Sequence, residues 1–311
     1  MTEIVDPTRI ETVLEDFQQL DHLPEIAKKR RLAHWPTLIA ATWLILLIGY
    51  MILGKIFGES LPFYQDPVPS GFILDFDGAL APPSAEHWMG TDGLSRDVFS
   101  RSVDASYVSL VVALTSVLFG MFLGGFLGVF AGYVRGGTET GIMTFIDMIL
   151  AFPAIVLLLG LITFMGSGYG LSTIAIAIGF ISIPYYARVA RANTLSVSQR
   201  EFVTAAQTAG ARRGRVLFRE IIPNVLPSVL AYAMVAAGVV IVVEGALAFL
   251  GLSVQPPTPS WGAMINEGRS DLAQVTHQVF FPSMFLIFTV LSMNVLGDTL
   301  RRKFDIKESS I

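Results

Sequence analysis

The segment that comes nearest to a catalytic motif is Gly49–Ile56, which almost matches the phosphate-binding loop G-x-x-x-x-G-K-[ST]. In that loop the backbone amides cradle nucleotide phosphates, and the last hydroxyl binds Mg²⁺. Here Ile56 replaces the hydroxyl, and the segment lies inside an apolar run. We therefore interpret Lys55 as the end of a membrane span whose amine reaches water. The chain itself is expected not to hydrolyse ATP.

The other residues that could do chemistry form no recognisable set. The chain has no cysteine, and its four histidines are not spaced as metal ligands. The loops contain no nucleophile beside a base and no paired carboxylates. We expect no catalytic residue and no metal site.

Two carboxylates, Asp147 and Glu244, fall within or close to apolar segments. A charge at the centre of a bilayer costs roughly 3 kcal/mol on insertion scales, so such residues usually face a cavity or a polar partner. Each residue therefore either lines a translocation path or forms hydrogen bonds that join neighbouring helices and loops.

The composition indicates that membrane helices position these residues. Of the 311 residues, 53% are hydrophobic and 15% are charged, whereas soluble domains carry about 25% charged residues. Five long uncharged stretches can each supply the ~20 residues of a span, and Gly166–Gly170 divides the third, longer stretch into two. We predict an all-α integral membrane protein with six transmembrane helices, at about 36–56, 105–134, 142–165, 171–195, 224–250 and 279–300.

The distribution of basic residues predicts the orientation of these spans. Of the 21 Lys and Arg residues, 17 lie in the two termini and the second and fourth loops, and 4 lie on the opposite face. Both termini are therefore expected to be cytoplasmic, in a multi-pass membrane protein. The predicted parts are a cytoplasmic tail (1–34), a first span (35–56), an extracytoplasmic loop (57–104), a five-helix core (105–302) with a cytoplasmic loop at 196–223, and a second tail (303–311).

A row of glycines in the second predicted span is suited to close helix packing. Gly120, Gly124, Gly128 and Gly132 recur every fourth residue and lie near one face. Small residues let two helix backbones approach each other. The seam lies either within this chain or between subunits.

The fourth loop has the pattern of a short amphipathic helix. Ser198 and Glu201 have the spacing of a capping box, and Gly210 stands where a left-handed residue ends a helix. On these residues alone, the loop either docks into a groove of another protein or lies on anionic lipid, which its arginines also favour. The expected apolar face is Phe202, Val203, Ala206 and Ala209, and the basic residues are Arg200, Arg212, Arg213, Arg215 and Arg219.

This loop resembles the EAA loop of permease subunits from ATP-binding-cassette (ABC) importers. Ala205, Ala206 and Gly210 have the spacing of that motif, and Thr204 stands where the motif has Glu. Three further blocks resemble the dipeptide/oligopeptide/nickel permease family over about 85–302, and they indicate its C-type subunit. They are Gly90–Arg101, in which Ser95 replaces the usual glycine, Asp147–Pro153, and Glu244–Leu252 followed by Gln255–Gly262.

The resemblance implies a type I ABC importer permease fold, in a bacterial cytoplasmic (inner) membrane, and several partners. These are a second related permease, two ATPases that carry ATP and Mg²⁺, an extracytoplasmic solute-binding protein and membrane lipid, with no role for nucleic acid. The implied substrate is a di- or oligopeptide, with nickel, glutathione or another small solute as alternatives. A secondary transporter or channel is less favoured because no inverted repeat is evident.

The candidate site residues fall into three groups. Trp261 either contacts the solute-binding protein or braces the outer face of the membrane domain. Asp147 and Glu244 are the candidates for the translocation path. The residues implied to couple the chain to an ATPase are Glu201, Phe202, Val203, Ala205, Ala206, Gly210, Arg212 and Arg213.

Overall fold

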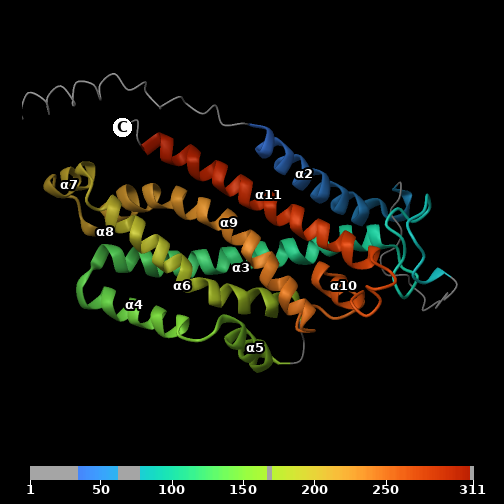
Figure 1. Ribbon diagram of the computed structural model, residues 1–311. Helices are drawn as coiled ribbons and strands as arrows, with labels where there is room; N and C mark the ends of the chain where they lie inside the picture. Colours follow the sequence, from blue (N-terminus) through green and yellow to red (C-terminus); the bar gives the residue numbers. More distant parts are fainter. Residues whose placement is uncertain (1–33, 62–77, 167–169, 309–311) are drawn as a thin grey trace, which may run out of the picture. The chain divides into compact units, whose positions relative to one another are not determined.

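The structure is a computed structural model that describes residues 34–61, 78–166 and 170–308. The described residues from Thr37 onward form one compact unit. Within the described ranges, the regular secondary structure is helical apart from one isolated antiparallel bridge between Thr91 and Asp97. The elements in Figure 1 are α2 (His34–Phe57), η1 (Gly58–Ser60), α3 (Val98–Val134), α4 (Gly136–Leu150), α5 (Ala154–Met165), α6 (Leu171–Val197), α7 (Glu201–Thr208), α8 (Arg213–Val216), η3 (Leu217–Ile221), α9 (Ile222–Phe249), α10 (Trp261–Glu267) and α11 (His277–Glu308).

Five helical segments of the described chain are long and apolar enough to cross a membrane. They are α2, α3, α6, the continuous run from α8 through α9, and α11, which confirm five of the six predicted spans. Large apolar side chains such as Phe122 and Phe126 remain exposed on them. That exposure suits helices whose surroundings are lipid or another membrane subunit, because a helix satisfies its own backbone hydrogen bonds there.

The remaining predicted span, at 142–165, is broken. Helices α4 and α5 pass the same test only as a pair, and they are bent by 89° relative to each other. Pro153 has no N–H to donate, and its ring disfavours a helical conformation at Phe152, so α4 ends at Leu150 and α5 begins at Ala154. The prediction of one helix was wrong because a bend leaves the apolar composition unchanged.

The glycine row of α3 packs against α6 within this chain, which decides between the two predicted seams. A Cβ atom at Gly124 would collide with the carbonyl oxygen of Ile183, and one at Gly128 would collide with that of Ala187. The missing side chains therefore allow the two backbones to touch. We infer that α3 and α6 move as one rigid pair.

The compact unit has two distinct ends. Helices α7 and α8 lie at one end together with the C-terminal end of α11, and α10 lies toward the other end, near residues 78–97 (Figure 1). At this second end α3 begins at Val98, earlier than the predicted Ala105. The cause is Asp97, whose carboxylate caps the helix by accepting a hydrogen bond from the Ser100 amide at 2.8 Å.

Candidate functional site

The fourth loop folds as a short helix with a sharp glycine stop. Helix α7 is followed by Gly210, whose φ angle is +81°. The Ala211 amide donates to the Ala206 carbonyl at 3.1 Å, and the Gly210 amide donates to the Gln207 carbonyl at 2.9 Å. This pair of bonds is the Schellman pattern. The predicted left-handed stop at Gly210 is confirmed.

The predicted start of this helix was wrong. Ser198 is the C-cap of α6, and its hydroxyl donates to the Leu195 carbonyl at 3.0 Å and accepts from Arg135 Nη2 at 3.1 Å. Arg200 is the N-cap of α7, and its side chain makes no capping hydrogen bond. Because α6 continues through Val197, Ser198 serves the end of that helix and is not available as a cap for Glu201.

One side of α7 attaches the helix to its own chain. Val203 is fully buried and Ala206 is partly buried, in the apolar cluster that also contains Val216 and Ile221. Both residues were predicted to belong to the docking face. Their burial instead fixes the position of α7 on the segment that leads into α9.

Another side of α7 is open to the surroundings. Phe202 keeps 38% of its surface exposed, and Glu201, Ala205 and Ala209 are exposed as well. We call Phe202, Ala205 and Ala209 the outer flank of α7. Its small alanines and single aromatic ring form a narrow apolar surface that fits a groove.

Basic residues lie directly beyond this flank. Arg212, Arg213, Arg215 and Arg219 are all exposed, and in the described ranges none of them has an ion-pair partner. Tyr133 at the end of α3 donates its hydroxyl hydrogen to the Arg213 carbonyl at 3.0 Å, which anchors the start of α8. The loop thus presents a narrow apolar flank beside four uncommitted positive charges.

The loop joins the core through one continuous helical run. Helix α8 passes into the π-helical turn η3 and then into α9. Pro223, at the start of α9, offers no N–H to the Arg219 carbonyl, and the wider π-helical turn before it accommodates the proline ring. The segment from α8 onward therefore forms one helical run with α9.

Glu244 lies near the opposite end of α9 and is completely buried. One carboxylate oxygen accepts a hydrogen bond from Ser109 Oγ of α3 at 2.9 Å, and the other accepts from Ser253 Oγ at 2.8 Å. These bonds join α3, α9 and the segment after α9. The arrangement corresponds to the second of the two roles predicted for Glu244, the joining of helices and loops.

Asp147 lies on α4 just before the bend, and its side chain is 59% exposed. It accepts a hydrogen bond from Arg188 Nη2 of α6 at 2.7 Å. A second ion pair, between Arg191 and Glu139, joins the same two helices at 2.6 Å. Because Asp147 is open to its surroundings, its role in a translocation path stays a prediction.

Trp261 is fully buried and offers no surface to another protein. Its indole Nε1 donates to the Ser102 carbonyl of α3 at 2.8 Å. It is the first residue of α10, which Ser260 caps by accepting from the Ala263 amide at 3.2 Å. Of the two predicted roles, these contacts match the bracing role.

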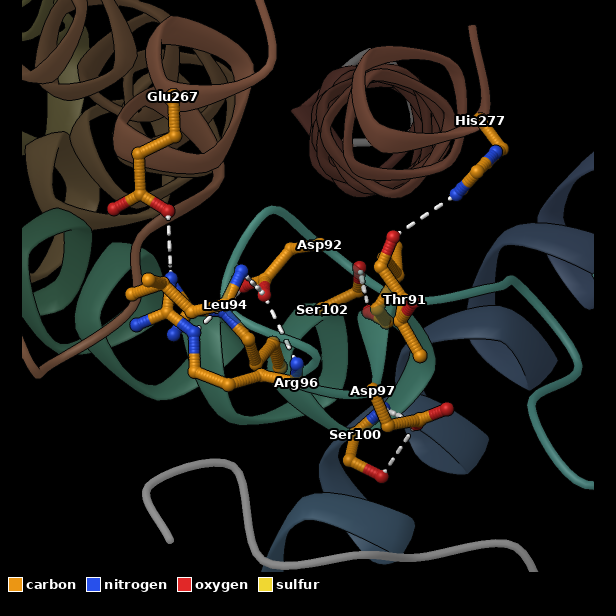
Figure 2. A network of polar contacts seen from close by, with 11 residues as sticks. Thr91, Asp92, Leu94, Arg96, Asp97, Ser100, Ser102, Glu267 and His277 are labelled. Atoms are coloured by element: carbon orange, nitrogen blue, oxygen red, sulfur yellow. Dashed lines mark hydrogen bonds and ion pairs between the residues drawn. The ribbon is translucent and has the colours of Figure 1, made fainter. Parts of the chain in front are cut away.

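A charged network not predicted from the sequence joins α10 to α3 and to the turn that precedes α3 (Figure 2). Arg96 donates to Asp92 Oδ2 at 2.7 Å and to Glu267 Oε2 at 3.1 Å. Arg101, which is buried, donates from Nη2 to the same Glu267 oxygen at 3.2 Å, and its Nε lies 3.3 Å from Asp92 Oδ2. The only signal for this network was the polar block Gly90–Arg101.

The tight turn in that block forms although Ser95 replaces glycine. Ser95 has a φ angle of +62°, a left-handed conformation that glycine adopts more easily. The Asp92 carboxylate holds the turn, because its Oδ1 accepts from the Leu94 and Arg96 amides, both at 2.9 Å. These two hydrogen bonds hold the backbone on both sides of Ser95 in the turn.

The segment Gly49–Ile56 is helical throughout and forms part of α2, so it does not make a phosphate-binding loop. Lys55 Nζ lies 3.1 Å from the ring centre of Tyr107, a cation–π contact with α3. Within the described ranges, no group of three or more His, Asp or Glu side chains is arranged to hold a metal ion.

A bundle of apolar helices with a short exposed helix on an internal loop agrees with the expected membrane permease. The chain belongs to the family described as binding-protein-dependent transport system inner membrane component, which matches residues 124–308. It is an ABC importer permease of the dipeptide/oligopeptide/nickel type, as the sequence resemblance implied.

Among its relatives are two proteins named Glutathione transport system permease protein GsiD. The one from Pectobacterium atrosepticum is 40% identical over 247 residues, covering 79% of this chain and 81% of the relative. The one from Salmonella paratyphi A is 38% identical over 262 residues, covering 84% of this chain and 86% of the relative.

Solved structures of ABC transporters share the fold. An inward-facing MetNI methionine ABC transporter chain matches with a TM-score of 0.56 at 18% identity, covering 65% of this chain and 95% of that chain. An amino acid ABC transporter with histidines matches with a TM-score of 0.53 at 16% identity, covering 66% of this chain and 94% of that chain. At these identities the likeness concerns the fold alone.

Proposed function

We propose that this permease imports short peptides or glutathione, paired with a second related permease and driven by two separate ATPases. The observation that carries the proposal is the outer flank of α7, held in place by the buried Val203 on the segment that continues from α8 into α9. The names of the relatives support a peptide-like substrate, since glutathione is a modified tripeptide. They favour it over nickel.

In the proposed cycle, the outer flank of α7 sits in a groove of one ATPase. Closure of the two ATPases around ATP and Mg²⁺ displaces α7, and the rigid run from α8 through α9 carries this motion to the level of Glu244. Because Glu244 is bonded to α3, the outer ends of α3 and α9 shift together and change the access of the substrate path. Nucleotide binding thus biases a two-state element in this chain, which itself holds no cofactor.

The proposed orientation places both termini and α7 in the cytoplasm. It is supported by the 17 basic residues of the expected inner face against 4 on the other. The C-terminal end of α11 also lies at the α7 end of the compact unit (Figure 1). An extracytoplasmic solute-binding protein then delivers substrate to the opposite end, where α10 and the charged network lie.

The test is to place a charge on the outer flank and measure retention of the ATPases. In Ala205→Asp the new carboxylate must lose its water to enter an apolar groove, so retention of the ATPase subunits during purification of the complex should fall by more than about tenfold. Substrate uptake should fall in parallel, with normal membrane abundance of the permease.

Thr204→Glu is the matched control. It adds the same charge to an adjacent exposed position of α7 outside the outer flank, where the family motif itself carries glutamate. Retention and uptake should stay close to those of the unmodified chain. Equal retention in Ala205→Asp and Thr204→Glu would refute docking through the outer flank.

A further inference from the structure

An apolar groove of about 410 Å³ opens between α3 and the helical run of η3 and α9, and we call it the α3–α9 groove. Every residue that lines it is apolar. Three of its aromatic rings are largely exposed: Phe122 at 75%, Phe126 at 63% and Phe218 at 68%. Because burial of such surface is favourable, the groove calls for an apolar occupant.

The length of the groove matches one leaflet of a bilayer. Its lining runs from Leu118 to Phe130 on α3 and from Leu217 to Val229 on the facing run. At about 1.5 Å per residue, each wall is about 18 Å long. The whole hydrocarbon core is about 30 Å thick, so a spanning helix of another subunit would need a longer groove. An acyl chain of a single leaflet fits this length.

The groove ends at the fourth loop. On one wall Phe130 is followed by Tyr133, whose hydroxyl donates to the Arg213 carbonyl at 3.0 Å. On the other wall Leu217 directly follows α8. Tyrosine is enriched where a membrane meets water, and in the proposed orientation this end faces the cytoplasm. A lipid of the cytoplasmic leaflet would therefore have its headgroup beside α8 and η3.

Two exposed arginines lie close to this end of the groove. Arg215 precedes Phe218 by three residues, and Arg219 precedes Ile222 by three, a spacing that makes side chains neighbours on a helix surface. Within the described ranges, neither arginine is ion-paired, and the adjacent Glu220 pairs with neither of them. Basic residues between membrane helices on the cytoplasmic side suit anionic headgroups. The charge thus favours an anionic lipid over a neutral one.

We propose that the α3–α9 groove binds an anionic phospholipid of the cytoplasmic leaflet, with an acyl chain between α3 and α9 and its phosphate beside Arg215 and Arg219. Gly125 supports the path of the chain, because a Cβ added there would meet no atom within 4 Å. The acyl chain can therefore lie on the bare backbone of α3 at that point. The proposal uses the proposed orientation, but it depends on neither the substrate nor the ATPases.

The test is native mass spectrometry of the full chain in detergent, titrated separately with dioleoylphosphatidylglycerol and with dioleoylphosphatidylcholine. The two lipids have the same acyl chains and differ in headgroup charge. Each arginine near an anionic headgroup is worth about fivefold in affinity, so phosphatidylglycerol should bind roughly twentyfold more tightly. Equal affinities for the two lipids would overturn the proposal.

Gly125→Leu tests the acyl-chain part of the site. The new side chain fills the groove without a clash in the protein, so phosphatidylglycerol binding should weaken at least about tenfold. Gly160→Leu is the matched control, because Gly160 is an exposed glycine of α5 that also has open space around it and lies outside the groove. Binding should be unchanged in the control. Unchanged binding in Gly125→Leu would contradict the site.

A double variant tests the headgroup part. Arg215→Gln combined with Arg219→Gln should bring the two lipids to within about threefold of each other in affinity. Arg302→Gln combined with Lys303→Gln removes the same charge from exposed positions at the end of α11, outside the groove, and should keep the preference. Equal loss in both double variants would show a general effect of net charge and overturn the assignment to Arg215 and Arg219.

The alternative occupant is the second permease, and the same measurement on the assembled complex distinguishes it. We expect phosphatidylglycerol to stay bound when the two permeases are purified together. Release of the lipid on assembly would assign the groove to the second permease and overturn the proposal. Loss of ATPase retention plays no part in either result, so this site and the proposed coupling can fail separately.

Discussion

Replacing Gly128 with alanine should separate the two helices that form the rigid pair. The added Cβ would fall on the carbonyl oxygen of Ala187, and that backbone group cannot rotate away. Overpacking of this kind costs about 3 kcal/mol at its upper end. Alanine recovers about 1 kcal/mol of helix propensity. The expected net loss in the free energy of unfolding is therefore about 2 kcal/mol.

Gly125 provides the matched control on the same helix. It has no neighbour within 4 Å of an added Cβ, so Gly125→Ala should show only the gain of about 1 kcal/mol from propensity. The two variants should thus differ by about 3 kcal/mol although the chemical change is identical.

The assay is thermal unfolding of the full chain in detergent, followed by the loss of monodisperse protein on size-exclusion chromatography. Gly128→Ala should melt several degrees below the unmodified chain, and Gly125→Ala should melt at or above it. Identical melting of the two variants would show that α3 and α6 do not touch at this seam, and it would remove the rigid pair from the mechanism.

Other predictions concern Gly210 in the fourth loop, Ser95 in the turn that precedes α3, and the orientation of the chain in the membrane. Gly210→Val should cost about 2 kcal/mol and uncouple ATP hydrolysis from uptake, because valine resists the left-handed conformation, whereas Gly210→Asn should retain coupling; equal uptake by both variants would contradict this. Ser95→Gly should raise the free energy of unfolding by about 1 kcal/mol, and a lower melting temperature would show that the serine itself holds the turn. A single cysteine at the exposed Thr258 should react with an impermeant maleimide added outside intact cells. A single cysteine at the exposed Gln199 should react only after the membrane is permeabilised. The reverse pattern would overturn the orientation.

The spans were predictable because a bilayer demands long apolar segments, and that demand is visible in composition. The bend between α4 and α5 was not, since Pro153 sits within an apolar stretch that can equally form a kinked helix or two helices. Which of these forms depends on the neighbours, and here α6 holds α4 through Arg188 and Arg191.

The structure of the fourth loop was predicted in part. The stop at Gly210 was foreseen because a left-handed residue is a local requirement of the backbone. The start at Ser198 and the membership of Val203 in the docking face were wrong. Helical spacing identifies residues that share a side, but it does not reveal whether that side meets the same chain or a partner.

The sequence by itself determined the class of the protein, the number of spans apart from one bent pair of helices, and the position of the fourth loop. These features follow from hydrophobicity, charge distribution and local backbone preferences, which act over a few residues. Only the tertiary structure decided that Trp261 is internal, that Glu244 joins α3 to the segment after α9, and that Arg101 and Gln278 line one cavity. Residues 101 and 278 are far apart in the chain, and only the packing of α3, α10 and α11 brings them to one cavity.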